Sequence, residues 1–244
     1  MMSQMLKPIE HHRVVDQVYE QIRDLIFRGR IKPGERLMPE RKMANSLKVG
    51  RPAIREAIQK LVQSNLVETR RGSGTFVAQL ETRKQLGSFA QLLQGQKFTV
   101  QEFLEVRMAL ECNGAALAAK RATEEDLQLL ESNIKTMKKE MLESLEKRDL
   151  YQDLSFHMNI SYATRNMVQI SLMKSFYDFM LYGMQEMLPR LIRIPGLDPL
   201  VMEQHIMIFD AIRQRNPDLA QDAMKVHINT IMDHYGKSTF DLET

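Results

Sequence analysis

The sequence has few of the features that mark secreted or membrane-embedded proteins. Cys112 is the single cysteine among 244 residues, so the chain cannot form an intramolecular disulfide. It has no run of about 18 apolar residues, so no membrane-spanning helix is expected. The N-terminus lacks the apolar core of a secretory signal peptide, and the chain contains neither internal repeats nor low-complexity tracts. These absences predict a cytoplasmic protein with no membrane partner.

The composition is that of a globular protein, but the charges are unevenly distributed. Apolar residues make up 43% of the chain and charged residues 27%, which is ordinary for a protein with a hydrophobic core. Residues 1–78 hold 15 Lys and Arg against 8 Asp and Glu, a net charge of +7, whereas residues 79–244 hold 19 against 23, a net charge of −4. A basic first part and a mildly acidic second part are typical of a nucleic-acid-binding domain joined to a domain with another task.

Residues 29–78 are arranged like a winged helix-turn-helix. Two short helical patterns with apolar stripes are separated by a tight junction at Gly50, which can cap the second helix. Pro52 suits the first turn of that helix, where its missing N–H leaves no hydrogen bond unmade. Two strand patterns follow, Leu66–Thr69 and Thr75–Ala78, joined by a turn of arginine, glycine and serine.

The second of these helices carries the candidate base-reading residues. Arg51 and Arg55 stand one turn apart, at the edge of its apolar stripe. A helix of this type can enter the major groove and offer arginine side chains to guanine edges. The turn between the strands adds Arg70, Arg71 and Gly72, which can approach the DNA backbone. A merely solvated helix face and a protein-docking module are the alternatives, but the basic wing and the charge balance favour duplex DNA.

The rest of the chain predicts an all-helical bundle, so the fold class is mainly α with a small β-hairpin wing. Apolar residues recur with helical spacing in these segments: Phe89–Leu93, Phe103–Ala119, Leu127–Leu145, Leu150–Ala163, Val168–Leu188, Pro199–Arg213 and Leu219–Tyr235. The predicted organisation is a flexible arm, a winged helix-turn-helix domain, a linker, a helical domain and a tail, at residues 1–12, 13–78, 79–84, 85–236 and 237–244.

Four residues of the predicted helical domain have the types and spacing of a metal site. Asp153 and His157 are four residues apart, so both project from one helix face. His205 and His227 lie on later predicted helices, and each histidine shares a face with apolar residues, where an ionisable group needs a partner. One carboxylate and three imidazoles suit zinc, nickel, manganese or a similar divalent cation. The alternative is three unrelated buried histidines, each bonded to a backbone carbonyl.

Both parts of the chain resemble the GntR family of bacterial transcription regulators, in the FadR-like branch with an all-helical FCD effector domain. The motifs that carry the resemblance are PGERL at 33–37, VGRPAIREAIQKL at 49–61 and RRGSGTFV at 70–77. By this resemblance Arg41, Arg51 and Arg55 contact DNA, and Gly72 lies at the wing tip. Gly50 departs from the Ser or Thr that the family favours at its position.

The resemblance extends to the proposed metal ligands. Metal-binding members of the branch place an Asp four residues before a His, followed by two more His residues about 22 apart on later helices. Asp153, His157, His205 and His227 match that pattern.

Three further residues are expected, by the same resemblance, to bind the effector. Arg107 and Glu111 match an Arg and a Glu of the branch, and Asn166 matches the Asn of a Gly-Asn pair, with Arg165 in place of the glycine. Arg107 is expected either to hold a ligand carboxylate bidentately or to form a structural salt bridge with Glu111, four residues away.

The resemblance implies a metabolite-sensing repressor and not an enzyme. The expected regulator is a homodimer that places two recognition helices in successive major grooves of a pseudo-palindromic operator in double-stranded DNA. Its effector would be a small carboxylate such as lactate, pyruvate or glycolate, held by the metal. Three alternatives stay open: a metal-free sensor of a larger ligand such as an acyl thioester, a regulator that senses the cation itself, and a metal-dependent enzyme that activates water.

Overall fold

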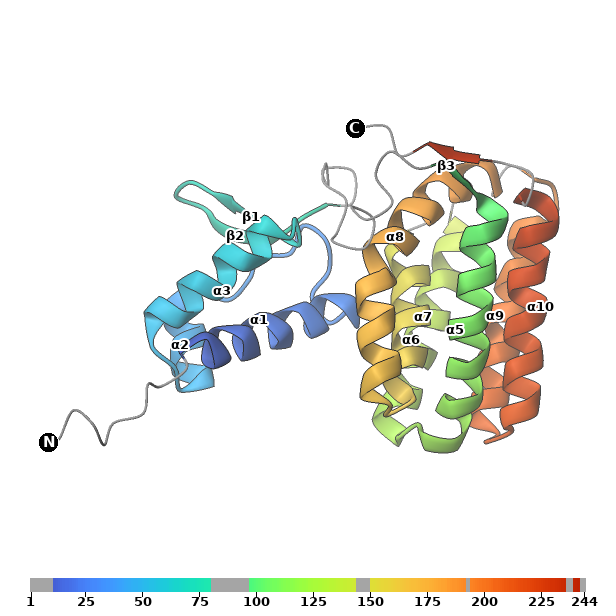
Figure 1. The fold of residues 1–244 in the computed structure, drawn as a ribbon, viewed down its shortest axis with the longest axis horizontal. Helices are drawn as coiled ribbons and strands as arrows, with labels where there is room; N and C mark the ends of the chain where they lie inside the picture. The colour runs from blue at the N-terminus through green and yellow to red at the C-terminus, as the bar shows by residue number, and fades with distance from the viewer. Residues whose placement is uncertain (1–10, 80–96, 144–149, 192–193, 236–238, 242–244) are drawn as a thin grey trace, which may run out of the picture. The chain divides into compact units, whose positions relative to one another are not determined.

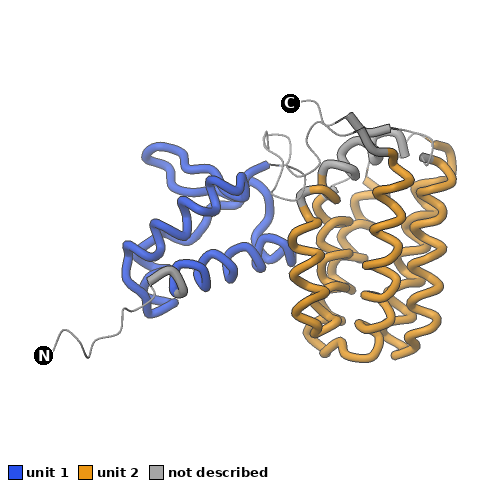
Figure 2. Tube along the Cα trace, viewed as in Figure 1, with its two compact units in different colours: residues 1–85 blue, residues 86–244 orange. Residues whose placement is uncertain are grey.

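The computed structural model describes residues 11–79, 97–143, 150–191, 194–235 and 239–241, coloured along the chain in Figure 1. The chain divides into two compact units, Met1–Gln85 and Leu86–Thr244 (Figure 2). The predicted fold class is confirmed, because the first unit joins helices to a β-hairpin and the second is mainly helical. None of the helices in the described ranges combines the length and apolar character that a membrane crossing requires.

The first unit is a helix-turn-helix with one supporting helix and a wing. Its described elements are α1 (His11–Phe27), α2 (Glu40–Leu47), α3 (Arg51–Gln63), β1 (Val67–Arg70) and β2 (Gly74–Val77). Helices α1 and α2 both pack against α3, because each presents an apolar stripe at helical spacing. The buried side chains of these stripes are Val15, Val18, Ile22, Ile26, Phe27, Met43, Ala44, Ala53, Ile54, Ala57, Ile58 and Leu61.

The wing is an antiparallel hairpin in which Val67 lies opposite Val77. Both strands lie one residue from their predicted bounds. The preceding segment joins them through a single bridge between Arg36 and Phe76, where the Leu37 N–H donates to the Thr75 carbonyl at 2.8 Å. This third segment was not predicted, because one bridged residue is too short to show any periodicity.

The second unit is a helical bundle. Its described helices are α5 (Val100–Arg121), α6 (Glu124–Glu143), α7 (Leu150–Ala163), α8 (Met167–Leu191), α9 (Leu197–Arg213) and α10 (Pro217–Tyr235). Helix α5 packs against α7, α8, α9 and α10. Helix α7 is buried over almost its whole surface, so its polar side chains face protein and not solvent.

The predicted arm, the predicted first helix of the second domain and the predicted linker lie partly or wholly outside the described residues. Helix α1 begins at His11, so the end of the predicted arm is helical, while residues 1–10 lie outside the described residues. The predicted helix at Phe89–Leu93 and all but the first residue of the linker at 79–84 also lie outside them, so the domain boundary stays a prediction.

The predicted tail at 237–244 contains a short strand. Within it, β4 (Thr239–Asp241) pairs antiparallel with β3 (Lys97–Thr99), directly before α5. The prediction of an all-helical second domain missed this sheet, because strands of three residues leave no recognisable alternation.

Candidate functional site

The surface of α3 is divided between a buried face and an exposed arginine edge. Gly50 caps the helix with an extended backbone, and Pro52 lies in its first turn, as predicted. Arg51 and Arg55 are exposed, as is Arg41 on α2. Arg55 donates from Nε to Glu40 Oε2 at 2.9 Å, whereas Arg41 and Arg51 form no ion pair with any other described residue. Both are therefore available to an external anion.

The two wing arginines differ in their surroundings. Arg70 donates from Nε to Glu68 Oε1 at 2.8 Å, and its guanidinium carbon lies 4.5 Å from the centre of the Phe76 ring. Arg71 is exposed, and Gly72 has a φ of +75°, which favours glycine at the tip of the turn. Arg71 is thus the wing arginine that points freely into solvent, while Arg70 is held against the hairpin.

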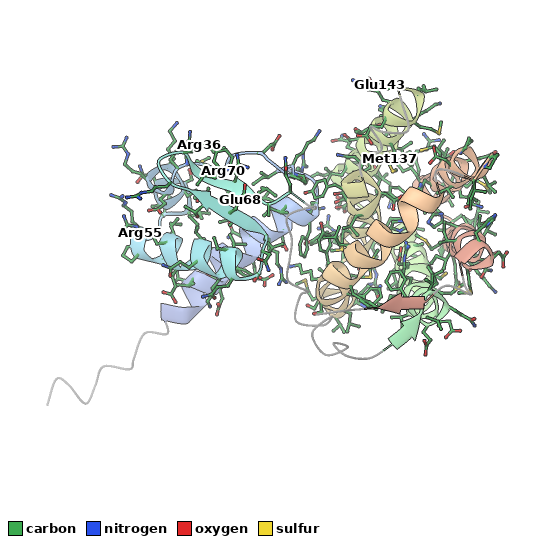
Figure 3. All side chains as sticks on the ribbon, turned by 90° about the horizontal axis from the view of Figure 1, so that it is seen from above. Arg36, Arg55, Glu68, Arg70, Met137 and Glu143 are labelled. Atoms are coloured by element: carbon green, nitrogen blue, oxygen red, sulfur yellow. The ribbon has the colours of Figure 1, made fainter. Side chains whose placement is uncertain are left out.

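Sequence reasoning missed Arg36, which belongs to the same surface. A Cβ at Gly74 would lie only 2.8 Å from Arg36 Nε, so the missing side chain of Gly74 makes room for this guanidinium against the wing. Arg36 and Arg70 are both seen beside the hairpin in Figure 3. The one signal for Arg36 in the sequence is its place in PGERL, and nothing in that motif indicates contact with a turn almost forty residues later.

His157 on α7, His205 on α9 and His227 on α10 converge inside the second unit. Each offers one ring nitrogen, and these three atoms lie within 4.8 Å of one another. The rings of His205 and His227 are 4.5 Å apart between centres, and both lie within 5.5 Å of the His157 ring. All three side chains are buried. The histidines form one cluster and are not unrelated core residues.

Asp153 lies at the edge of this cluster. Its Oδ1 is 3.1 Å from His205 Nε2 and its Oδ2 is 3.8 Å from His157 Nε2. The side chain is 21% exposed, whereas the two histidine side chains beside it are fully buried. The Asp153 carboxylate therefore lies between the buried histidines and the surface of the bundle.

Arg107 and Glu111, both on α5, form a second layer against His157. Arg107 Nε donates to Glu111 Oε1 at 2.6 Å, so the predicted salt bridge is present. Glu111 Oε2 makes an ion-pair contact with His157 Nδ1, and Arg107 Nη2 lies 3.3 Å from His157 Nε2. The pair thus reaches the histidine cluster itself.

The electrostatics favour the charged form of Glu111 and the neutral form of His227. Burial raises the pKa of Glu111, but the charges of Arg107 and His157 outweigh it and lower that pKa to about 2. Burial, with smaller contributions from His205, His157 and Arg107, lowers the pKa of His227 well below 6.5. A neutral imidazole is the form that binds metal.

The donor set fits a divalent cation. Three imidazoles and a carboxylate are the ligand types of zinc and related ions, and they lie in a largely dry interior. His227 Nδ1 has no hydrogen-bond partner among the described residues, and an unsatisfied buried polar atom costs about 1–3 kcal/mol. Coordination would satisfy a nitrogen of this kind, so the buried triad can hold a metal ion.

Asn166, expected to contact the effector, caps a helix in the structure. Its Oδ1 accepts hydrogen bonds from the backbone N–H groups of Val168 at 3.1 Å and Gln169 at 3.3 Å, which makes it a cap of α8. A narrow cavity beside the cluster is lined by Glu111, His157 and Gln169 among others, but not by Asn166. An effector contact by Asn166 stays a prediction.

Comparison with known proteins agrees with both units. The family described as "Bacterial regulatory proteins, gntR family" matches residues 14–77, and the FCD domain family matches residues 102–230. The HTH-type transcriptional regulator LutR of Bacillus subtilis (strain 168) is 31% identical over 86% of this chain and 95% of its own length. The Glc operon transcriptional activator of Escherichia coli (strain K12) is 28% identical over 96% of this chain and 92% of its own.

Two further similarities also cover most of the chain. An Escherichia coli (strain K12) protein named for regulation of the L-lactate dehydrogenase operon is 29% identical over 94% of this chain and 88% of its own length. The solved structure of a Streptococcus agalactiae GntR protein is 28% identical, covers 90% of this chain and 99% of its own, and has a TM-score of 0.47. These relatives are transcription regulators and not enzymes. The chain therefore belongs to the GntR family, in the FadR-like branch with an FCD domain, and is a ligand-responsive DNA-binding transcription regulator.

Proposed function

We propose that the FCD domain of this regulator holds a divalent cation between Asp153, His157, His205 and His227, and that the cation receives a small carboxylate effector. The observation that carries this proposal is the convergence of three buried ring nitrogens within 4.8 Å, beside a partly exposed carboxylate. Burying three imidazoles with no shared cation to bind their nitrogens would cost free energy of desolvation. Zinc, nickel and manganese are the proposed ions.

The effector class is inferred from the charge around the cluster. Arg107 is already paired with Glu111, so the excess positive charge that would favour an anion there comes from the proposed divalent cation, which Asp153 neutralises only in part. One relative is named for the L-lactate dehydrogenase operon, which supports a small hydroxy or keto acid. Repression stays a prediction, because the relatives include an activator by name as well as the repressor NanR.

We infer that two copies act together on the operator. A helix-turn-helix dimer places its recognition helices about one DNA turn apart, in successive major grooves. For the acid to alter operator affinity, it must bind the two arrangements of such a dimer unequally. A coupling of about 1–3 kcal/mol gives a change of about 5- to 150-fold. Because the target is bacterial operator DNA, the proposed place of action is the cytoplasm.

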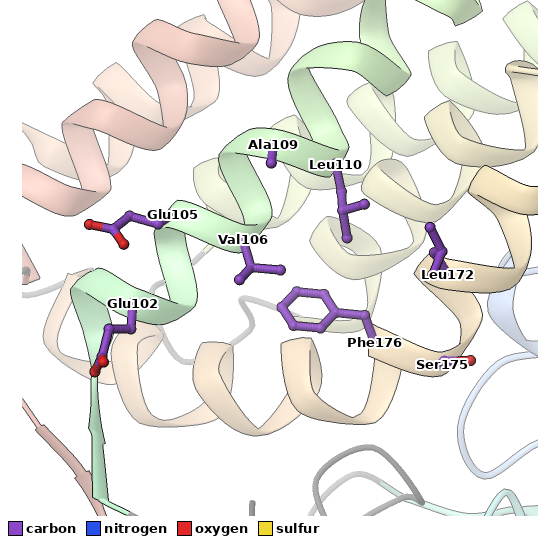
Figure 4. Close-up of a pocket in the computed structure, with 8 residues that line it drawn as sticks. All are labelled: Glu102, Glu105, Val106, Ala109, Leu110, Leu172, Ser175 and Phe176. Carbon is purple, nitrogen blue, oxygen red and sulfur yellow. The ribbon is translucent and has the colours of Figure 1, made fainter. Parts of the chain in front are cut away.

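An exposed groove between α5 and α8 supports self-association. It has a volume of about 590 Å³ and a mainly apolar lining, in which Val106 and Leu110 of α5 face Phe176 of α8 (Figure 4). Val106 is 43% exposed and Leu172, at the same groove, is 50% exposed. An apolar hollow of this kind commonly marks an interface, and we propose a second copy of this chain as its occupant.

The metal and effector proposal is tested by thermal unfolding with small organic acids, with and without zinc. An effector at about 100 times its Kd should stabilise the protein by about 2.7 kcal/mol, and only when zinc is present. His205→Ala should abolish this shift, yet keep operator binding in the absence of acid. His234→Ala, an exposed histidine on α10, is the matched control and should behave like the wild type. A shift of equal size without metal would favour a metal-free sensor.

The dimer proposal is tested by light scattering. The double change Val106→Glu and Leu172→Glu should yield monomers and weaken operator binding at least tenfold. Leu142→Glu, at an exposed apolar position of α6, should leave both unchanged. Intact dimers of the groove variant would show that the copies meet elsewhere.

A further inference from the structure

Glu111 lies where an effector contact was expected, but both of its oxygens are used inside the protein. Its side chain is buried, Oε1 accepts from Arg107 Nε at 2.6 Å, and Oε2 contacts His157 Nδ1. An effector would have to displace one of these contacts to reach the carboxylate. The position of Glu111 between Arg107 and His157 therefore points to a role other than ligand contact.

The two nitrogens of His157 face opposite surroundings. Nδ1 faces Glu111, whereas Nε2 lies 3.8 Å from Asp153 Oδ2. His205 also turns its Nε2 toward Asp153, at 3.1 Å from Oδ1. The Nε2 atoms of both histidines thus meet at the Asp153 carboxylate, and Nδ1 of His157 points away from that meeting point.

Both neighbours of the His157 ring require the same tautomer. A carboxylate oxygen repels the lone pair of an imidazole nitrogen, so the close contact of Nδ1 with Glu111 Oε2 favours a proton on Nδ1, although the contact is not aligned as a hydrogen bond. A guanidinium can only donate, so Nε2, which lies 3.3 Å from Arg107 Nη2, must offer its lone pair. The two contacts lie on opposite nitrogens of the ring and assign the same state.

We propose that Glu111 is a positioning residue, which holds His157 as the Nδ1–H tautomer and so leaves a lone pair on Nε2, on the side of the ring where Asp153 lies. In the proposed complex the cation would take the place of the Arg107 contact with this lone pair. The inference rests on the proposed function, in which this lone pair is a metal ligand. Carboxylates behind metal-binding histidines orient the ring and raise its basicity, and their loss typically weakens metal binding by about 10- to 100-fold. Arg107 pairs with Glu111 and so holds that carboxylate in place behind His157.

The tautomer is tested in metal-free wild-type protein. Two-bond ¹H–¹⁵N correlation spectra of labelled histidine, with His157 assigned through the His157→Gln variant, should give the Nδ1–H pattern at neutral pH. An Nε2–H tautomer would overturn the proposal. This spectrum needs neither metal nor a variant of Glu111, so it tests the inference even if wild-type protein binds no zinc, a result that would instead refute the proposed function.

The consequence for metal binding is tested by zinc competition with a chromophoric chelator. Glu111→Gln should lose the fixed tautomer and bind zinc about 10- to 100-fold more weakly. Asp126→Asn is the matched control, because Asp126 is another buried carboxylate paired with an arginine, Arg165, in the same unit. It should bind zinc like the wild type. Wild-type zinc affinity in folded Glu111→Gln would overturn the proposal, and the wild-type spectrum decides if that variant does not fold.

Discussion

Nε of Arg55, on the recognition helix α3, donates a hydrogen bond of 2.9 Å to Oε2 of Glu40 at the start of α2. The Arg55 side chain is 61% exposed, so this bond restrains the direction of the guanidinium while most of the side chain stays open to solvent. An arginine held in this way has less side-chain entropy to lose when it meets a base edge. The pair connects the fold of the helix-turn-helix to its proposed specificity.

Arg55→Ala should weaken binding to the operator by about 1–3 kcal/mol and relax the base preference at one position. The comparison is made by fluorescence anisotropy on an operator selected from random duplexes and on its single-base variants. Lys60→Ala is the control, because Lys60 lies at the other end of α3, paired with Asp16. If Arg55→Ala keeps both affinity and base preference, α3 does not read the operator through this residue.

Glu40→Ala should distinguish the role of Glu40 in orienting Arg55 from the effect of its negative charge on DNA binding. Without the carboxylate, Arg55 is no longer held in one direction, so discrimination between operator and random DNA should fall. Binding to random DNA should strengthen slightly, because a negative charge near the phosphates has been removed. A parallel loss of affinity for both DNAs would mean that Glu40 acts only through the stability of the domain.

The two wing arginines should respond unequally to truncation. Arg71→Ala should weaken binding to all sequences alike and reduce the slope of log affinity against log salt by about 1, the signature of a lost phosphate contact. Arg70→Ala should change the slope less, because Arg70 is paired with Glu68 and stacked on Phe76. Salt titrations from low to physiological ionic strength measure both. Equal slopes for wild type and Arg71→Ala would remove Arg71 from the interface.

Asp126 should make the stability of the effector domain dependent on pH. It caps α6 through Thr123 and pairs with Arg165, and although burial raises the pKa of Asp126, these contacts lower it below 3.8. A folded-state pKa below the unfolded value means that the stabilisation is present above 3.8 and is lost as the pH falls through the folded pKa.

Asp126→Asn should therefore reduce the free energy of unfolding by about 1 kcal/mol at neutral pH. The difference from wild type should shrink as acid is added below pH 3.8. Urea unfolding across that range measures it. A difference that is constant with pH would mean that the charge of Asp126 contributes nothing.

Most helices could be predicted because the buried face of a helix appears in the sequence as apolar residues at helical spacing. The Leu150–Ala163 helix was predicted to the residue, and Gly50 and Pro52 marked a helix start that the structure contains. The β3–β4 pairing was missed, because its stability depends on residues at opposite ends of the effector domain and not on any local pattern.

The candidate site could be predicted only in part from the sequence. Helical spacing alone places Asp153 and His157 on one face, but the approach of His205 and His227 was expected mainly from the family resemblance. The contact between Glu111 and His157 joins α5 to α7, and no spacing rule relates side chains of different helices. Arg165 is a similar case. It replaces a family glycine at a φ of +51°, and its side chain reaches Asp126 on α6.

The central claim is that the effector domain binds a divalent cation through its buried histidines. The most direct test is a zinc titration of purified wild-type protein and His227→Ala, followed by elemental analysis after removal of free metal. The account predicts a single zinc ion per wild-type chain and a loss of affinity of at least tenfold in folded His227→Ala. Wild-type protein that retains no zinc, or a variant that binds it as tightly, would contradict the account.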